Sequence, residues 1–179
     1  MSRILPAIDS LDQHLYQLEY HPEAYRPACC PHCGVGILWC HGYYYRKADR
    51  EGSEGHYLDP VPIPRYYCPG CMQTCSRLPS CIAPRRWYLW VVQQAALALL
   101  LSGSSFRGAA RQCQPGRRTI SRWWHWLEAR FDQYSFHLRS RFQSLGRHDS
   151  FTAFWSASFR QMSLADAMAW LDRDGVVIP

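Results

Sequence analysis

The sequence contains no long apolar run. Its longest, Ala95–Leu101, is far shorter than the roughly 20 residues that a helix needs to span a bilayer. The first residues, Met1–Pro6, show no extended apolar region like that of a secretory signal. No long internal repeat is present either, which excludes a solenoid. We therefore expect a cytoplasmic protein with no membrane partner.

Acidic residues are almost absent from the middle of the chain. The net charge is +6, but residues 82–147 alone carry eleven arginines against only Glu128 and Asp132. The segments on either side, 1–81 and 148–179, are slightly acidic. A basic segment between near-neutral ends is typical of a surface that binds a polyanion, although a solvated basic face would have the same composition.

Two cysteine pairs with the spacing of metal ligands stand out. The chain has nine cysteines, an odd number that does not favour a disulfide framework. Cys30-Pro-His-Cys33 and Cys68-Pro-Gly-Cys71 each place two thiolates in one tight turn, and two such turns complete the four-sulfur shell of a zinc ribbon. The sequence therefore predicts a structural Zn²⁺ on Cys30, Cys33, Cys68 and Cys71. The alternatives are a redox dithiol and unrelated buried cysteines.

The five remaining cysteines and two nearby histidines can be interpreted without a role in metal binding. Free cysteine usually behaves as a small buried hydrophobic residue, and we expect this of Cys29, Cys40, Cys75, Cys81 and Cys113. Because Cys75 and Cys81 closely follow the second pair, the replacement of a ligand by one of them stays open. His32 and His41 are interpreted as surface or hydrogen-bonding residues, since four thiolates already fill the shell.

Local patterns predict strands in the cysteine-rich segment and helices elsewhere. Strands are expected at 37–41, 43–46 and 61–67, the last an edge strand or an extended segment because its prolines cannot donate to a ladder. Apolar spacing predicts helices over 4–20, with Asp9 or Ser10 near the start, and over 87–101, 105–113 and from 117 through Leu138 to Gly146. A last helix follows Ser163, has Asp166 at the capping-box position and stops at Asp174-Gly175.

Residues 105–127 have the layout of a helix-turn-helix, with a turn at Gln114-Pro115-Gly116. Ile120, Trp123, Trp124 and Leu127 are expected to face inward, and Ala109 and Ala110 are small where the two helices would cross. The outward residues of the second helix would then meet the major groove, together with two arginines of the first helix. The predicted DNA contacts are Arg107, Arg111, Arg117, Arg118, Thr119, Ser121, Arg122 and His125. The alternative is an ordinary helical hairpin with solvated arginines.

Other basic residues are expected to add phosphate contacts. They lie in the predicted ribbon and just before the first long helix: Arg46, Lys47, Arg65, Arg85 and Arg86.

The ordered combination of these motifs resembles a known group of proteins. Cys30-Pro-His-Cys-Gly34, Gly42–Arg46, Arg65–Cys71 and Leu78-Pro-Ser80 resemble the zinc ribbon that opens many bacterial insertion-sequence transposases. Ser104–Arg111 with Thr119–Trp124 resembles their helix-turn-helix. The resemblance covers residues 28–130 and is strongest to short zinc-ribbon/helix-turn-helix proteins of mobile elements. That pattern has an aromatic residue near position 75, where this chain has Cys75.

The resemblance also implies what this chain would lack. In such transposases a large catalytic domain with three acidic metal ligands follows these modules. Only about fifty residues follow here, so we expect no transposition chemistry and no enzyme activity. The acids of this segment are interpreted as helix caps and surface charge: Asp149, Asp166, Asp172 and Asp174.

The resulting prediction is an α+β protein, mainly α, with a small β zinc ribbon packed on a helical helix-turn-helix domain. Its segments are an N-terminal helix (1–27), the ribbon (28–82), the helix-turn-helix domain (83–145) and a helical C-terminal tail (146–179). The expected function is binding of double-stranded DNA at the nucleoid, as a transposase-related accessory or regulatory factor.

Three other functions stay open. The first is an adaptor that docks on a transposase or an RNA-guided nucleoprotein complex through exposed aromatic residues at Trp126, Phe151, Phe154, Trp155 and Trp170. A zinc-dependent enzyme would need an open metal position, which four thiolates deny. RNA binding is a variant of the leading hypothesis, because ribbons also bind RNA.

Overall fold

The computed structural model describes residues 3–46, 60–84 and 88–178. Three predicted phosphate contacts, Lys47, Arg85 and Arg86, lie outside the described residues. The fold is α+β and mainly α, as predicted. The chain divides into two compact units, residues 1–89 and residues 90–178, which we call the cysteine unit and the helical unit. Among the described helices, none has the length and apolar character needed to cross a membrane.

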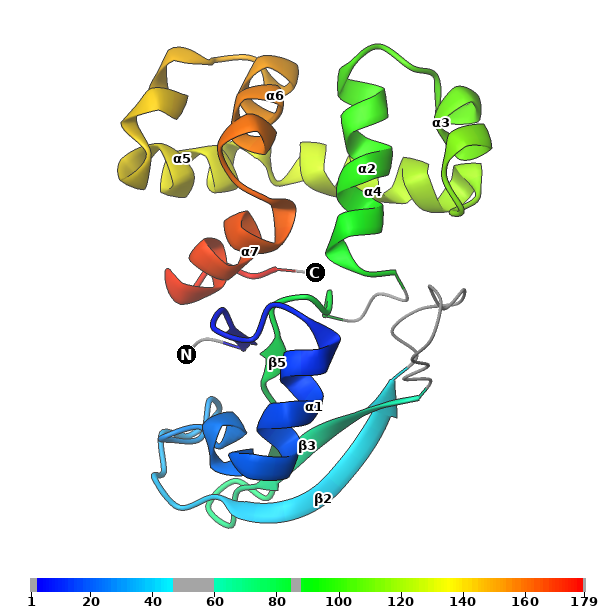
Figure 1. Ribbon diagram of the computed structural model, residues 1–179. Coiled ribbons are helices and arrows are strands. Elements are labelled where there is room, and N and C mark those ends of the chain that lie inside the picture. The colour runs from blue at the N-terminus through cyan, green and yellow to red at the C-terminus, as the bar shows by residue number, and fades with distance from the viewer. Residues whose placement is uncertain (1–2, 47–59, 85–87, 179) are drawn as a thin grey trace. The chain divides into compact units, whose positions relative to one another are not determined.

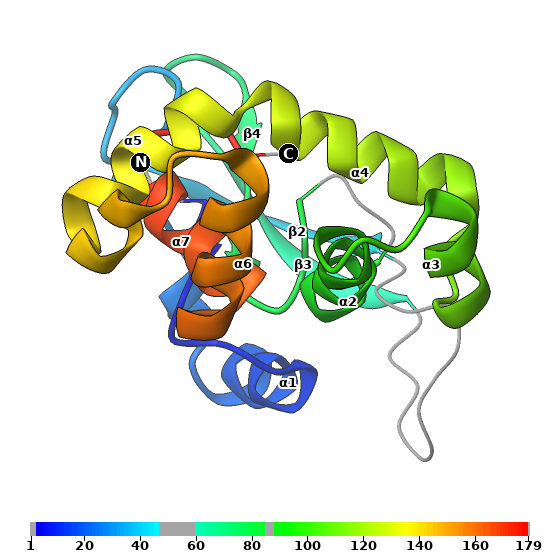
Figure 2. The ribbon, with the colours of Figure 1, turned by 90° about the horizontal axis from the view of Figure 1, so that it is seen from above.

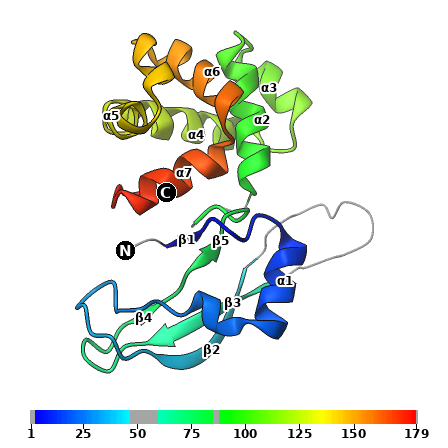
Figure 3. The ribbon, with the colours of Figure 1, turned by 60° about the vertical axis from the view of Figure 1, so that its left-hand side comes forward.

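The cysteine unit combines two small sheets with one helix (Figures 1 and 3). Strands β2 (Trp39–Arg46), β3 (Val61–Tyr67) and β4 (Thr74–Cys75) form an antiparallel sheet in the order β2-β3-β4. Strand β1 (Ile4–Leu5) pairs in parallel with β5 (Leu78–Pro79). Helix α1 (Leu11–Tyr20) is followed by the 3-10 helix η1 (Pro22–Tyr25).

The helix predicted over 4–20 begins only at Leu11, so its first part was predicted wrongly. Ile4 and Leu5 instead form β1, because they find a strand partner more than seventy residues away that local spacing cannot reveal. Ser10 caps the helix, and its hydroxyl accepts from the Gln13 N–H at 3.2 Å. The residue of α1 that is fully buried is His14, whereas Leu15 is 37% exposed.

Strand β3 is the middle strand of its sheet, where an edge strand or an extended segment was predicted. Its prolines are nevertheless in an edge-like position, because β4 pairs only with Tyr66 and Tyr67. At Pro62, helix α1 takes the place of a second neighbouring strand. Its His14 Nε2 lies 2.8 Å from the Pro62 carbonyl oxygen. The missing N–H of proline therefore costs the sheet no ladder bond there.

The strands predicted at 37–41 and 43–46 are joined in the single strand β2. Its register shifts between Cys40 and Tyr43, which marks a bulge. Gly42, inside the bulge, has a φ of 71°. That left-handed conformation is easily adopted by glycine, and it lets one strand continue across the irregularity.

The helical unit contains six α-helices and one 3-10 helix in its described residues. They are α2 (Trp90–Leu101), α3 (Phe106–Gln112), α4 (Arg117–Ala129), α5 (Phe131–Arg141), η2 (Gln143–Arg147), α6 (Phe151–Gln161) and α7 (Leu164–Arg173). Helix α2 contacts α3, α4, α6 and α7, and Figure 2 shows it end-on between α3 and α6. Helix α2, predicted over 87–101, is therefore the central helix of this unit.

Two features of the helical unit differ from the sequence prediction. The helix expected from 117 through Leu138 breaks at Arg130, which ends α4 and begins α5. Helix α6 was not predicted. Its cap is Ser150, whose hydroxyl accepts from the Ala153 N–H, and its buried face carries Phe154 and Trp155. This face completes the core beside α2.

Candidate metal centre and basic face

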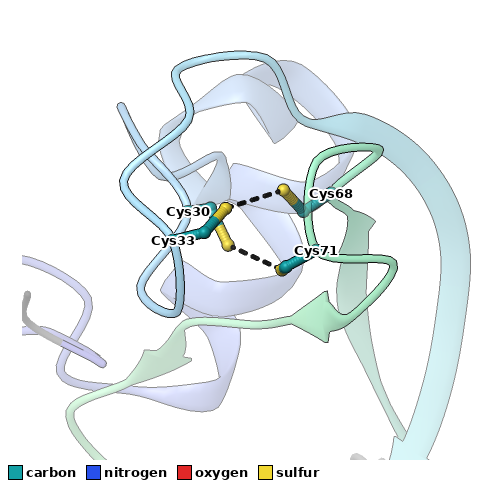
Figure 4. Close-up of side chains that lie close together, drawn as sticks. All are labelled: Cys30, Cys33, Cys68 and Cys71. Atoms are coloured by element: carbon teal, nitrogen blue, oxygen red, sulfur yellow. Dashed lines mark hydrogen bonds between the residues drawn. The ribbon is translucent and has the colours of Figure 1, made fainter.

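Four cysteines converge between two turns of the cysteine unit. The sulfurs of Cys30 and Cys71 are 3.6 Å apart, those of Cys33 and Cys68 are 3.5 Å apart, and all four lie within 4.8 Å of one another (Figure 4). These distances are far longer than the S–S bond of about 2 Å in a disulfide. The four predicted ligands therefore lie together as free thiols, in an arrangement that can hold a metal ion.

The two turns share a backbone conformation. In each, the residue after the second cysteine has a left-handed φ, 77° at Gly34 and 57° at Met72. The Cys30 carbonyl accepts from the Gly34 N–H at 2.9 Å, and the His32 N–H donates to the Cys30 sulfur at 3.4 Å. Such N–H groups support negative charge on a coordinating sulfur.

A hydrophobic cluster surrounds the inner side of the cysteines. Cys30 and Cys68 are buried with Leu5 and Tyr25, and the remaining members are Ile8, Leu38 and Tyr66. Cys33 is exposed and Cys71 is half-buried. The cluster thus connects β1, η1 and β3 to the metal centre, so that closing the four-sulfur shell also fixes these elements.

The electrostatics of the four thiols favour a cation. Burial opposes ionisation of Cys30, but hydrogen bonds from backbone N–H groups and neighbouring thiols outweigh it and lower its pKa to about 7. Burial raises the pKa of Cys71 to about 12. Four thiolates at these distances would repel one another strongly, whereas a divalent cation compensates their charge and deprotonates them.

The remaining cysteines and nearby histidines lie outside this cluster. Among the described residues, only the four predicted ligands form a candidate metal group. Cys75 is half-buried against the hydrophobic cluster, and burial raises its pKa. Cys40 is exposed, which corrects the expectation of a buried residue. His32 and His41 are exposed, as predicted.

Helices α3 and α4 pack on each other across the Pro-Gly turn. Ala109 is fully buried on α3, and Ile120, Trp123 and Leu127 form the buried face of α4, as predicted. Trp124, also predicted to face inward, is only half-buried. The Phe106 ring lies 6.4 Å from the Trp124 ring and fixes the start of α3 against α4. Exposed arginines, Arg117, Arg118 and Arg122, lie on the opposite face of α4.

Five of the eight predicted DNA contacts line one surface hollow of about 780 Å³. They are Arg107, Arg117, Arg118, Ser121 and Arg122. Ser105 and Phe106, which the sequence indicated only as helix-forming residues, complete the lining. We call this surface the basic hollow. Within the described part of the chain, none of its four arginines forms an ion pair.

The other three predicted contacts lie outside the hollow. Arg111 is exposed on α3, and Thr119 is half-buried at the start of α4. His125 is exposed and lies 3.3 Å from a Glu128 carboxylate oxygen, which partly compensates any charge on the ring. In the cysteine unit, Arg65 lies over the Tyr44 ring and Arg46 donates to the Ala83 carbonyl, so neither is a freely extended side chain.

The aromatic residues considered for an adaptor do not form an exposed patch. Phe154 and Trp155 are fully buried. Trp126 contacts Tyr134 edge-on, Phe151 contacts Trp124, and Trp170 lies beneath Arg141 and Arg173. Trp126, Phe151 and Trp170 are thus half-buried against neighbouring side chains of the helical unit.

The four aspartates of the C-terminal segment that were predicted as helix caps or surface charge differ in their burial and partners. Asp166 belongs to a complete capping box with Ser163, as predicted. Asp174 pairs with Arg141, whose hydrogen bond lowers the pKa of this carboxyl group. Asp149 is almost fully exposed, whereas Asp172 is buried, which corrects its interpretation as surface charge. Among the described residues, these acids form no candidate metal group.

Comparison with known proteins places the chain in one family. A model described as a domain of unknown function (DUF6431) matches residues 30–123, slightly more than half of the chain. The chain belongs to this family. The DUF6431 segment begins at the first clustered cysteine and ends within α4, so it includes both the metal centre and the basic hollow. No curated protein and no solved structure matches the chain.

Proposed function

We propose that the protein binds double-stranded DNA through the basic hollow, while a structural Zn²⁺ stabilises its cysteine unit. The observation that carries this proposal is the hollow itself, which collects four arginines without an ion pair among the described residues. Guanidinium groups placed so close together repel one another, and this cost is offset when phosphates approach.

The position of the arginines on their helices supports duplex DNA. Arg117, Arg118 and Arg122 lie in the first two turns of α4, the part of a recognition helix that enters the major groove. Arg107 lies in the first turn of α3, where a phosphate contact would hold the helix pair against the backbone. Gly116 provides no side-chain cap to α4, so the first N–H groups of this helix suit a phosphate.

The geometry of the four sulfurs supports zinc. A tetrahedral ion with Zn–S bonds of about 2.3 Å places its sulfurs about 3.8 Å apart. The two closest contacts, 3.5 and 3.6 Å, are near this value. Zn²⁺ accepts four soft ligands without redox chemistry, and four thiolates leave no position for a substrate. We therefore propose a structural role for the ion and a non-enzymatic protein.

The biological role that we propose rests on the resemblance to zinc-ribbon/helix-turn-helix proteins of mobile elements. The described part of the chain after α4 is a set of helices that completes the core around α2. A transposase-related accessory or regulatory factor, acting beside a transposase or another nucleoprotein complex at the nucleoid, fits this organisation.

Selection of duplexes from a random pool by gel shift, followed by titration of the preferred site, tests the proposal. Arg118→Ala and Arg122→Ala should each weaken binding by about 1–3 kcal/mol if they contact bases. Arg160→Ala, an exposed arginine at the end of α6, is the matched control and should change little. Affinity should also fall steeply as salt increases.

Equal affinity of both variants and the wild type for the preferred duplex would remove the basic hollow as the DNA site. A single-stranded RNA of the same sequence serves as competitor in the titration. If it displaced the duplex at lower concentration than the duplex itself, RNA would replace DNA as the proposed partner.

A further inference from the structure

A second arginine-lined cavity lies in the cysteine unit, beside the Cys30–Cys33 turn, whose Pro31 and His32 contribute to its lining. Its volume is about 430 Å³, within the range of small-molecule sites. Arg3, Arg46 and Arg77 line it, although they are far apart in sequence. The hydroxyl-bearing side chains of Thr74 and Ser76 also contribute to the lining. Among the described residues that line it, none carries a carboxylate.

The parallel pairing of β1 with β5 brings two of these arginines together (Figure 3). Arg3 directly precedes β1, and Arg77 directly precedes β5. The Leu78 N–H donates to the Arg3 carbonyl oxygen at 2.8 Å, which holds the two backbones side by side. Their guanidinium groups therefore reach one cavity from a fixed base.

The third arginine comes from the end of β2 and is held in place by the backbone. Arg46 Nη2 donates to the Ala83 carbonyl oxygen at 2.9 Å. Burial lowers the pKa of Arg46, which reflects the cost of keeping a cation partly out of water. A guanidinium group has five N–H donors, more than a single carbonyl oxygen can occupy.

We propose that this cavity binds a phosphate group, carried either by a small molecule or by the end of a nucleic-acid strand. Arginine binds phosphate through paired hydrogen bonds, and hydroxyl groups supply further donors. Pro27, Pro31 and Pro84 also line the cavity. The site does not depend on DNA binding by α3 and α4.

Calorimetric titration of the full, zinc-loaded chain with inorganic pyrophosphate tests the site. Arg3→Gln and Arg77→Gln should each weaken binding about tenfold or more, because each removes a charged donor pair. Arg160→Gln is the control for the loss of one positive charge and should bind as the wild type does. Pyrophosphate should also slow hydrogen exchange around β1 and β5 of the wild type, a readout that needs no variant.

Two short single strands, identical except for a terminal phosphate or a terminal hydroxyl, distinguish the sources of the phosphate. A preference for the phosphorylated strand that disappears in Arg3→Gln assigns the site to strand ends. Binding of pyrophosphate without such a preference assigns it to small phosphorylated molecules.

Absence of pyrophosphate binding to the wild type, or equal binding by Arg77→Gln and Arg160→Gln, would overturn the proposal. The variant Arg118→Ala separates this result from the proposed function. It should lose duplex affinity and keep pyrophosphate affinity, so that either proposal can fail alone.

Discussion

The two ring nitrogens of His14 have different partners, which fixes the protonation state of this buried residue. Nε2 faces the Pro62 carbonyl, which can only accept, so Nε2 carries the proton. Nδ1 lies 2.5 Å from the Tyr25 hydroxyl and accepts from it. Burial lowers the pKa of His14 although the Pro62 hydrogen bond opposes this effect. The folded state thus holds a neutral imidazole that connects α1, η1 and β3.

This environment predicts a pH-dependent contribution to stability. Because the folded pKa is lowered, the unfolded chain takes up a proton more readily, so the contribution of His14 is present above about pH 6.5 and is lost as the pH falls below it. His14→Gln keeps a donor but cannot titrate. Urea unfolding of both proteins should show the wild type more stable at about pH 8, with the difference shrinking toward pH 5. A constant difference would contradict this prediction.

The left-handed backbone conformation of Gly34 and Met72 leads to a second prediction, which concerns metal affinity. A Cβ added at Gly34 would meet no atom within 4 Å, so Gly34→Ala tests backbone conformation alone. At a φ of 77° it should cost about 1–2 kcal/mol, measured as metal affinity roughly 5–30 times weaker in competition with a chelator. Met72→Gly should strengthen metal binding, because Met72 carries the same strain.

Gly36→Ala is the matched control for this pair. Gly36 has an ordinary φ, and its added Cβ would lie 3.7 Å from the Ala28 oxygen, which is a normal contact. A loss at Gly36 as large as that at Gly34 would show that the effect does not come from the left-handed backbone conformation of Gly34.

At the scale of elements, the sequence predicted what depends on local chemistry. The spacing of Cys30, Cys33, Cys68 and Cys71 was sufficient to predict the cluster, because each pair forms within one turn. Ser163 and Asp166 likewise predicted the start of α7. Strand β1 could not be predicted, because Ile4 and Leu5 are too short a run to show the polar–apolar alternation of a strand. They form a strand by pairing with the distant Leu78 and Pro79.

Helix α6 and the basic hollow show a further limit of the sequence. The buried face of α6 includes Ala157 and Ser158 beside Phe154 and Trp155, so the spacing of large apolar residues alone did not identify this segment as a helix. The arginines of α4 could be placed outward from the buried spacing of Ile120, Trp123 and Leu127. Ser105 and Phe106 line the same hollow because of the way α3 packs. This packing cannot be derived from the sequence.

The capping box of α7 predicts the stability of the helical unit. The Ser163 hydroxyl accepts from the Asp166 N–H at 3.0 Å, and the Asp166 carboxylate accepts from the Ser163 N–H at 3.2 Å. Ser163→Ala removes the first bond and should lower the free energy of unfolding by about 1 kcal/mol, followed by circular dichroism in urea. Ser140→Ala, on the exposed side of α5, should change it by less than about 0.5 kcal/mol.

At the scale of the whole molecule, the division into two units predicts separate responses to metal removal. The four sulfurs and their surrounding cluster belong to residues 1–89, whereas α2 to α7 have a core of their own. Structural zinc in small domains contributes about 10–16 kcal/mol of apparent binding free energy, comparable to or larger than the stability of a typical domain. The cysteine unit should therefore unfold without its metal.

Hydrogen exchange of the full chain, with and without a chelator, measures this directly. Protection in β2 and β3 should disappear while that of α2 and α4 persists. Cys68→Ser should reproduce the effect of the chelator, and Cys40→Ser, which changes an exposed cysteine outside the cluster, should not. Simultaneous loss of protection in both units would mean that they fold as one.

The break at Arg130 has a consequence for how this chain can vary. Arg130 is both the C-cap of α4 and the N-cap of α5, so no further residue separates the two helices. One inserted residue would rotate everything beyond it by about 100° around the helix axis. Tyr134 and Leu138, both buried, would swing away from their neighbours. This joint should tolerate exchange of its side chain far better than any change in chain length.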